Sequence, residues 1–566
     1  MKYNQKIKTF ATQLLIVFGL IHTSFNINAQ HTYIPNGGIS QHILDRLEIK
    51  SGELANDYFQ SSGKSYRRKA IANYIDSFPV NKVSLSSVDF FNMDYLITDN
   101  FEWSNRENSF TKKRFLKSFY KRKSALYSTT IKDFNLIVNP VLYYQVSTDK
   151  WNGQNALINN RGVEIRGNIG DKIGFYTSVS DEILKPHSWV GDYLLKEGVL
   201  PYANFVKPYD NYYGYFLSNA YVTGSLNKYM DLQFGHYRNF LGDGYRSFIM
   251  GDMHPEYLSM RLNTRIWKMN YTNIWAELRE PALGGRAAQS RRYMATHHLG
   301  LNLGKNFNIG VFETIIFQRD SGHVGSGFDP NYLNPVIFFK SVENGLNSTD
   351  KAILGMNYKY NFLKHFSLYG QVVISEFVLE KIVNNTGWMH NKYAIQTGLK
   401  YVDVLGIKNL DLQGEFNLSR PFQYTSYNAA QSFSNFRQFM GHPLGANFYE
   451  SIGILRYQPS NRVNIIAKLI MAQYGNDTNG SNFGKDPRLS YHTHSSPVYG
   501  NYITQGVFTT FIMTDLTVSY MAYHNLFLDL KMGYRRTQSV LEQFNFETAY
   551  FTMGIRLNIN QRNYDF

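Results

Sequence analysis

The sequence contains no cysteine among its 566 residues. Disulfides, thiolate metal sites, cysteine nucleophiles and a lipid anchor on an N-terminal cysteine are therefore excluded. Beyond its first residues the chain also lacks any run of about 18 consecutive apolar residues, so it offers no transmembrane helix. The mean hydropathy, −0.35, is that of a soluble protein. A membrane protein with this composition must place its lipid-facing residues in every second position of β-strands.

Aromatic residues and glycine are abundant, with 43 Tyr, 41 Phe and 43 Gly. Aromatic side chains form the girdles of outer-membrane barrels at both membrane interfaces. Apolar residues alternate with polar or small ones from Ala549 to Ile559, and the aromatic Phe566 closes the chain. This pattern predicts an all-β fold, a transmembrane antiparallel outer-membrane β-barrel. A soluble secreted all-β protein would show the same alternation of apolar and polar residues and is the alternative fold.

Tight turns separate the predicted strands. Gly170-Asp171-Lys172 joins two alternating segments, and similar turns recur at 304–306, 363–365 and 523–525. The segments between turns run about 9 to 15 residues, enough to cross a bilayer at a tilt. They predict a barrel of about 18 strands over residues 131–566, because single-chain bacterial barrels have even strand numbers. A lumen of that width is either a water channel or plugged.

Long connections alternate with these short turns. They fall near residues 182–212, 239–256, 279–291, 319–332, 378–391, 420–448 and 475–506. In outer-membrane barrels the long loops face outside the cell or fold into the lumen. We therefore expect the function to lie in these loops.

The N-terminus has the features of an export signal. Lys2, Lys6 and Lys8 precede the apolar run 14–21, and small and polar residues follow as far as Ala29. Residues 1–29 are thus predicted to be a cleaved secretory signal peptide, which agrees with an outer-membrane location. Residues 30–130 include apolar positions at helical spacing, such as Ile43, Leu44 and Leu47. They predict a small, partly helical segment that lies in the periplasm or plugs the lumen.

A basic stretch at 112–123 mixes lysine and arginine with aromatic residues; it comprises Lys112, Lys113, Arg114, Lys117, Lys121, Arg122 and Lys123 with Phe115, Phe119 and Tyr120. Such a stretch could bind nucleic acid, but an exported chain rarely meets any. A solvated face, or contact with anionic head groups of the outer-membrane lipid, is the preferred interpretation. No nucleic-acid partner is predicted.

Catalytic and metal-binding motifs are weak. Gly63-Lys64-Ser65 resembles the end of a phosphate loop, but Tyr58 replaces the required upstream glycine. His492 and His494 could point the same way, as could His297 and His298 in part, but no third ligand lies at a recognised spacing. We predict no enzyme activity, no metal site and no cofactor.

Charged side chains on one predicted strand are more informative. From Tyr257 onward Leu258, Met260 and Leu262 occupy one face, and Arg261 and Arg265 occupy the other. A charge on the lipid face costs about 2–4 kcal/mol near mid-membrane, so both arginines should point into the lumen. The same argument places Glu277 on the next strand, and Arg246, Arg291 and Arg292 close by in sequence, on the inner face. If the leucines faced the lumen instead, this register would be wrong.

Other charged and aromatic residues lie close by in sequence and complete a candidate set of lumen-lining or glycan-binding side chains: Arg246, Arg261, Arg265, Trp267, Trp275, Glu277, Arg291 and Arg292. One interpretation is a salt-bridged lumen wall or plug contact. The other is a path for an anionic glycan. The arginine guanidinium groups would then form paired hydrogen bonds with carboxylates or phosphates, and the tryptophans would stack on sugar rings. The net charge of +15 permits an acidic partner.

Several segments resemble a known family. They are HILDRLEIKSG (42–52), RGVEIRGNIGDKIGFYTS (161–178), FGHYRNFLGDGYRS (234–247), LNTRIWKMNYTNIWAEL (262–278), YLNPVIFFKS (332–341) and HPLGANF (442–448). As a set they resemble RemB-like gliding motility outer-membrane proteins of Bacteroidota, which are distantly similar to the Wzi capsule assembly family. The resemblance covers most of residues 40–566.

The resemblance implies a non-enzymatic surface barrel that takes part in gliding motility or in the assembly or attachment of surface polysaccharide. It also implies possible partners in the motility and secretion machinery. A transport pore for solutes or glycans is the alternative function. The two differ in whether the lumen is plugged or open.

Overall fold

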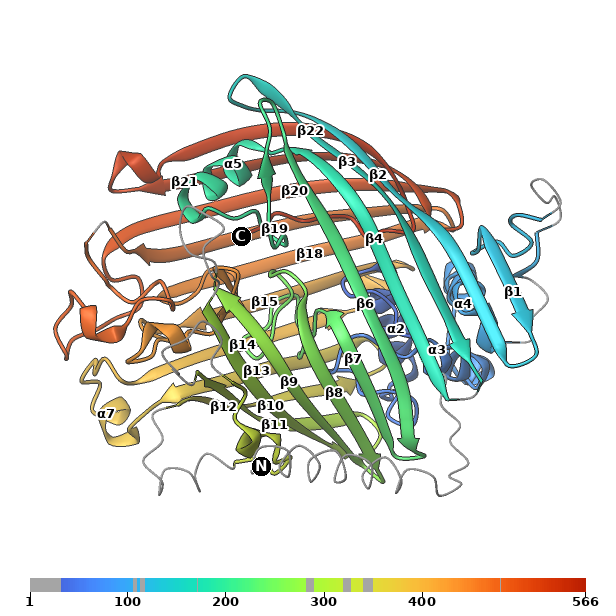
Figure 1. Ribbon diagram of the computed structural model, residues 1–566, viewed down its shortest axis with the longest axis horizontal. Helices are drawn as coiled ribbons and strands as arrows, with labels where there is room; N and C mark the ends of the chain where they lie inside the picture. The colour runs from blue at the N-terminus through green and yellow to red at the C-terminus, as the bar shows by residue number, and fades with distance from the viewer. Residues whose placement is uncertain are drawn as a thin grey trace, which may run out of the picture.

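The computed structural model describes residues 32–104, 109–111, 118–170, 172–280, 290–318, 327–338, 350–478 and 480–566. Within these residues, long antiparallel strands form a closed ring, in which the last strand, β22, pairs with the first, β2 (Figure 1). The ring contains the 18 strands that the sequence predicted. The predicted signal peptide lies outside the described residues, as do Lys112, Lys113, Arg114, Phe115 and Lys117 of the basic stretch.

The strands of the ring are β2 (Phe134–Trp151), β3 (Gln154–Ile169), β4 (Ile173–Lys185), β6 (Tyr213–Asn227), β7 (Met230–Tyr237), β8 (Tyr257–Ile266), β9 (Met269–Glu280), β10 (Ser290–Leu303), β11 (Phe307–Phe317), β12 (Lys351–Phe362), β13 (Phe366–Glu376), β14 (Lys392–Tyr401), β15 (Leu410–Ser419), β18 (Phe448–Ser460), β19 (Val463–Asn476), β20 (Val507–Tyr523), β21 (Leu526–Ser539) and β22 (Phe546–Leu557). Two short strands, β1 (Tyr127–Ile131) and β5 (Lys207–Pro208), add to β2 and β6.

Alternating residues of these strands face opposite sides of the wall. On β21, Leu528 and Leu530 are 45% and 48% exposed, whereas Asp529 between them is 6% exposed. On β8, Arg261 is buried and contacts the interior, while Leu262 lies on the other face. The predicted register is therefore confirmed, and the outer surface carries the apolar belt of a membrane-facing barrel.

One end of the barrel has short turns, and the other has the long loops. Three helices, α2 (Ile39–Ser51), α3 (Arg68–Asp76) and α4 (Ser87–Asp99), lie together inside the short-turn end (Figure 1). The amide of Leu54 donates to the carbonyl of Lys305 at one turn, and the Tyr95 hydroxyl donates to Asn525 at another. We call residues 32–104 the plug. Short turns of such barrels face the periplasm, so the plug occupies the periplasmic end of the lumen.

The sequence of the plug explains its helices. Gly52 ends α2 in the left-handed conformation, with φ of 74°, which a residue with a side chain rarely adopts. Ser86 begins α4 with a capping box, in which its hydroxyl and the Asp89 carboxylate satisfy each other's backbone amides. Apolar residues of α2, α3 and α4 pack together and against Met521 and Phe527 of the wall. Short 3-10 turns η2 (Val80–Lys82) and η3 (Phe101–Trp103) complete the segment.

The long loops fold inward as well as outward. Residues 238–256 and 420–447 contribute Phe248, Met250 and Met440, all fully buried, to an apolar cluster with lumen-facing strand residues such as Ile274. The second loop contains the hairpin β16 (Ser434–Asn435) and β17 (Gln438–Phe439) and the turn η8 (Ala429–Gln431). The other connections hold α5 (Ser188–Glu197), η5 (Pro330–Leu333), α7 (Leu379–Val383), η7 (Val404–Gly406), η9 (Tyr491–Thr493) and η10 (Glu542–Phe544).

The end of the chain departs from the sequence prediction. The last strand stops at Leu557, and Asn558 then turns with φ of 55°. The following residues run into the lumen, where Tyr564 and Phe566 pack near Trp189 and Tyr193. We call residues 558–566 the tail. Phe566 is therefore an interior residue and does not end a membrane strand.

No helix in the described part of the chain is long and apolar enough to cross a membrane.

Candidate functional site: a sealed lumen and an aromatic loop surface

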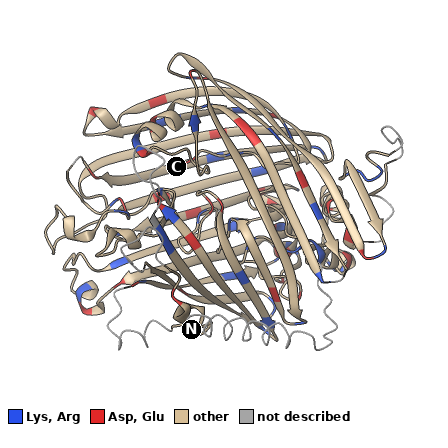
Figure 2. Cartoon of the chain, viewed as in Figure 1, with Lys and Arg blue, Asp and Glu red and all other residues tan. Residues whose placement is uncertain are grey.

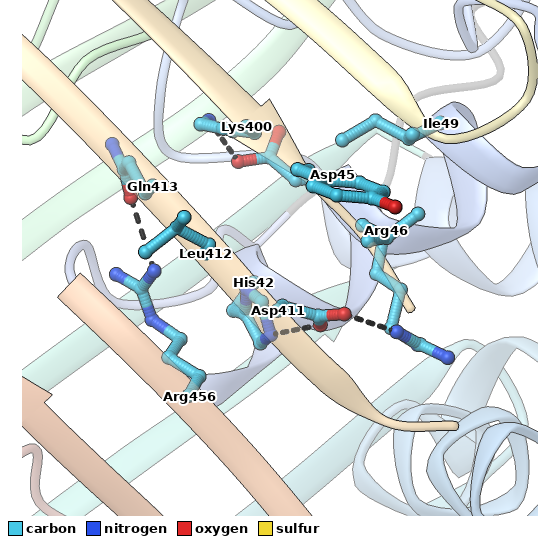
Figure 3. Close-up of a pocket in the computed structure, with 11 residues that line it drawn as sticks. His42, Asp45, Arg46, Ile49, Lys400, Asp411, Leu412, Gln413 and Arg456 are labelled. Carbon is cyan, nitrogen blue, oxygen red and sulfur yellow. Dashed lines mark hydrogen bonds and ion pairs between the residues drawn. The ribbon is translucent and has the colours of Figure 1, made fainter. Parts of the chain in front are cut away.

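Buried ion pairs fasten the plug to the barrel wall. Arg46 of α2 contacts Asp89 of α4 at 2.7 Å and Asp403 beyond β14 at 2.6 Å. It also forms an ion pair with Asp411 of β15 (Figure 3). Lys50, one turn along α2, lies 2.8 Å from Asp89 and 2.9 Å from Asp403. Figure 2 shows that positions of both charge signs lie along the strands of the barrel as well as on the helices of the plug. A buried pair is strongly destabilising to break, because the remaining charge is left without a partner.

Two lysines on the wall complete this attachment. Lys359 of β12, fully buried, lies 2.7 Å from Glu48, and Lys400 of β14 lies 2.6 Å from Asp45. Burial alone would raise the pKa of Asp45, but the charges of Lys400 and Lys64 hold it well below its usual range. The carboxylate therefore stays ionised at neutral pH. The charged residues of segment 42–52 contact oppositely charged side chains. This segment, one of those on which the family resemblance rests, therefore anchors the plug to the wall.

The tail is held in the same way near the middle of the lumen. Asp565 lies 2.8 Å from Lys468 of β19 and 3.4 Å from Arg246 of loop 238–256, and the Tyr245 hydroxyl donates to it. Charges of Lys468 and Arg246 overcome the effect of burial and lower the pKa of Asp565. The indole of Trp189 donates to the Tyr564 carbonyl at 3.0 Å. Tail, loop and wall thus share one buried network.

Four of the five predicted arginines, Arg246, Arg261, Arg265 and Arg292, face the interior. Arg246 reaches Glu450 at 3.4 Å besides the tail, and Arg292 lies 2.7 Å from Glu280 and holds Ser432 and Ser434 of loop 420–447. These two arginines join the tail and loop 420–447 to other parts of the barrel interior. Arg261 donates to Asn263 and to the Lys64 carbonyl of the plug. Arg265 lines a cavity beside the plug.

The other four predicted residues do not face the lumen. Glu277 forms an ion pair with Arg279 at 2.7 Å and lies 4.0 Å from Arg291 at the outer edge of the loop end. Trp267 stands at a short turn and is 78% exposed. Because residues alternate along a strand, Glu277 and Trp275 share the outer face. The prediction that the charged residues Glu277 and Arg291 point inward is therefore wrong.

Trp275 is nevertheless buried, because residues 327–338 cross the outer wall over it. We call them the strap. The Trp275 indole donates to the Tyr332 carbonyl at 2.7 Å, and the Tyr332 ring stacks on Phe317 with centroids 4.2 Å apart. Beneath the strap lie the outward polar residues His297 and Asn273, 2.6 Å apart. The strap shields these polar groups from lipid, while its own Leu333 and Val336 are exposed.

At the loop end, aromatic and histidine side chains from three long loops meet at the surface. We call Trp388, His390, Tyr427, Tyr491 and His492 the aromatic cluster. Centroid distances are 5.1 Å from Trp388 to His390, 5.1 Å from His390 to Tyr491 and 4.1 Å from Tyr427 to His492. Tyr427 is 67% exposed. Aromatic rings that are partly exposed to solvent can stack on the apolar faces of sugar rings.

Polar contacts hold the aromatic cluster in place. The Ser490 hydroxyl donates to the Tyr427 carbonyl at 2.6 Å and thereby joins two of the loops. Nζ of Lys392 lies 3.9 Å from the Tyr491 ring centre and 3.0 Å from Glu376, which also contacts His390 at 2.9 Å. Sequence reasoning identified these loops but missed the cluster. Its only sequence signal is the density of Tyr, Trp and His in loops that are far apart in the chain.

The histidines considered as metal ligands belong to no group of possible ligands in the described residues. Among the residues that the structure describes, no three His, Cys, Asp or Glu side chains are placed to hold a metal ion. His492 packs on Tyr427, and His494 contacts the Ser496 carbonyl. His298 faces inward to Asn357, opposite to His297.

No protein-family model matches the chain, and no curated protein matches it in sequence. Among solved structures, Wzi of Escherichia coli aligns over 94% of this chain and 100% of its own length, with 12% identity and a TM-score of 0.57. Wzi is described as an outer-membrane protein involved in group 1 capsule assembly and as a carbohydrate-binding β-barrel. This likeness shows a shared fold.

Outer-membrane proteins related to OprD align less well. OprD of Pseudomonas aeruginosa covers 75% of this chain and 93% of its own, at 10% identity and a TM-score of 0.41. OccAB2 of Acinetobacter baumannii covers 75% and 98%, at 8% identity and a TM-score of 0.42.

Proposed function

We propose that the protein is a non-enzymatic outer-membrane barrel that binds surface polysaccharide through its loop end and takes part in capsule assembly or attachment. The aromatic cluster is the observation that carries this proposal. Its rings come from three loops, lie within stacking distance of one another and are partly exposed. A binding surface for sugars needs such amphipathic rings with polar groups beside them.

The interior supports a binding role over transport. Helices, tail and inward loops occupy the lumen, and their contacts with the wall are buried ion pairs and close apolar packing. A pore needs a continuous wet path lined by polar groups. Two cavities at the plug are small, about 10 and 60 Å³.

A part in gliding motility rests on the sequence resemblance, and the same protein could serve both processes. Deletion of the gene separates them, scored in the same cells for movement over a surface and for capsule with a polysaccharide stain. Lost capsule with normal movement supports the proposal. Lost movement with intact capsule would refute it and assign the protein to the motility apparatus.

Binding is tested directly with the purified full-length protein in detergent and capsular polysaccharide isolated from cells that carry the gene. We expect saturable binding by the wild-type protein. Absence of binding at millimolar concentrations of repeating unit would contradict a polysaccharide-binding role even if the deletion strain lost its capsule.

A further inference from the structure

A cavity of about 60 Å³ lies between the plug and the hairpin of β8 and β9, away from the aromatic cluster. Its lining includes Tyr33, Gly63, Ser65, Arg67, Arg261 and Arg265. The cavity is several times larger than the roughly 10–15 Å³ that one water molecule needs. Arg265 and Asn270 of its lining flank the short turn between β8 and β9, and Arg265 is only partly buried, so the cavity lies near the periplasmic end of the barrel.

Cationic groups in this cavity exceed anionic ones. Arg67 is balanced by an ion pair with Asp231. Arg261 donates from Nε to Asn263 at 2.9 Å and from Nη1 to the Lys64 carbonyl at 3.2 Å, both neutral acceptors. No ion pair joins Arg261 or Arg265 to a carboxylate among the described residues, although Asp231 and Asp57 are near enough to act on the charge of Arg265.

Arg265 has the least satisfied donors. Its Nη1 is buried and has no hydrogen-bond partner within the described part of the chain. A buried donor without an acceptor is costly, and a guanidinium is the group that best matches the oxygens of phosphate or carboxylate. Gly63 helps to make room, because a Cβ there would lie 3.2 Å from Nη2 of Arg261.

We propose that this cavity binds a phosphate group presented from the periplasmic side, with Arg265 as its main ligand and Arg261 and the Tyr33 hydroxyl beside it. A phosphate fits better than a carboxylate, because donors converge from the plug and from the wall and a phosphate offers three or more oxygens. Its source is either a soluble phosphate compound or the head group of a lipid in the inner leaflet. The inference does not depend on polysaccharide binding at the loop end.

The test uses the full-length protein in phosphate-free detergent solution, titrated calorimetrically with inorganic phosphate. A second titration uses nanodiscs with and without phosphatidic acid. The variants are Arg265→Gln, Arg265→Lys and the matched control Arg279→Gln, which removes an arginine at the far end of the same hairpin. Heat-induced unfolding of each variant establishes that its barrel is intact.

Arg265→Gln should weaken phosphate binding about tenfold or more, and Arg265→Lys should recover part of it, because a charge-assisted hydrogen bond is lost and then partly replaced. Arg279→Gln should bind as wild type does. Sensitivity to inorganic phosphate identifies a soluble source, and sensitivity to phosphatidic acid alone identifies a lipid head group. If neither probe shows binding that Arg265→Gln weakens, the proposal is overturned.

Discussion

Oδ2 of Asp565 lies 2.8 Å from Nζ of Lys468, and this ion pair ties the tail to the inner wall of β19. Both side chains are almost completely buried, at 2% and 6% exposure. The pair fixes a segment that blocks the lumen, so its loss should be measurable as both reduced stability and increased leakage.

Asp565→Ala should destabilise the tail by roughly 3–5 kcal/mol, because Lys468 and Arg246 are left buried without their carboxylate. Conductance in planar lipid bilayers should rise, and it should rise further when the chain ends at Asn558. Glu547→Ala removes an exposed carboxylate and is the control, with conductance like that of wild type. Unchanged conductance in the shortened chain would mean that plug and loops close the lumen without the tail.

Acid should loosen the plug. Burial alone would raise the pKa of Asp89, but Arg46 and Lys50 overcome this and lower it to about 2. A carboxyl whose folded-state pKa is lowered stabilises the fold above its unfolded pKa of about 3.9, and this stabilisation is lost as pH falls through the folded value. Protease sensitivity of the plug should therefore be constant near neutral pH and rise between pH 4 and about 2.

Asp89→Asn should remove part of that pH dependence and make the plug sensitive to protease already at neutral pH. Asp192→Asn, in α5 away from the plug, serves as the control. A plug that resists protease equally in both variants would show that the ion pairs of Arg46 do not hold it.

The strap should depend on Tyr332, which is 1% exposed. Tyr332→Ala removes a fully buried ring and should cost roughly 3–5 kcal/mol of local stability, while Leu333→Ala, at an exposed position of the same segment, should cost little. Hydrogen exchange of the strap and of Trp275 would report detachment. Equal exchange in the two variants would contradict the packing described for the strap.

Tyr427→Ala should weaken binding of isolated capsular polysaccharide roughly tenfold, because a ring available for stacking is lost, and Tyr427→Phe should retain it. Tyr229→Ala removes a comparably accessible tyrosine at the short-turn end and should bind as wild type does. Equal affinity of the Tyr427 and Tyr229 variants would exclude the aromatic cluster as the binding surface.

The alternation of apolar and polar residues along the chain, with the turns between segments, was sufficient to predict the strands and their number. It also predicted that Arg261 and Leu262 lie on opposite faces of the wall. Alternation assigns a residue to one of two faces, and the cost of charge in lipid then chooses the inner face for arginine. That rule failed for Glu277 and Arg291, because they lie at the loop end of the wall, where an outward charge meets water.

The position of Trp275 could not be predicted, since local sequence gives no sign that residues about 60 positions later cover it. The tail is a similar case: Asp565 and Tyr564 have partners more than 90 residues away in the chain, Lys468 and Trp189. Residues 42–52, 234–247 and 332–338 make such distant contacts. Their charges and rings join plug, loop and strap to the wall, and only the three-dimensional structure shows which partners they have.

Because residues 558–566 run into the lumen, the position of a fusion tag affects the interior of the barrel. A purification tag or a fluorescent reporter fused after Phe566 would begin inside the barrel, next to Arg535 and Tyr193. A large fusion would displace the tail from the lumen, and the barrel should then leak in the same way as the chain shortened at Asn558. An epitope inserted at an exposed loop, such as the one around Tyr499, would leave the interior as it is.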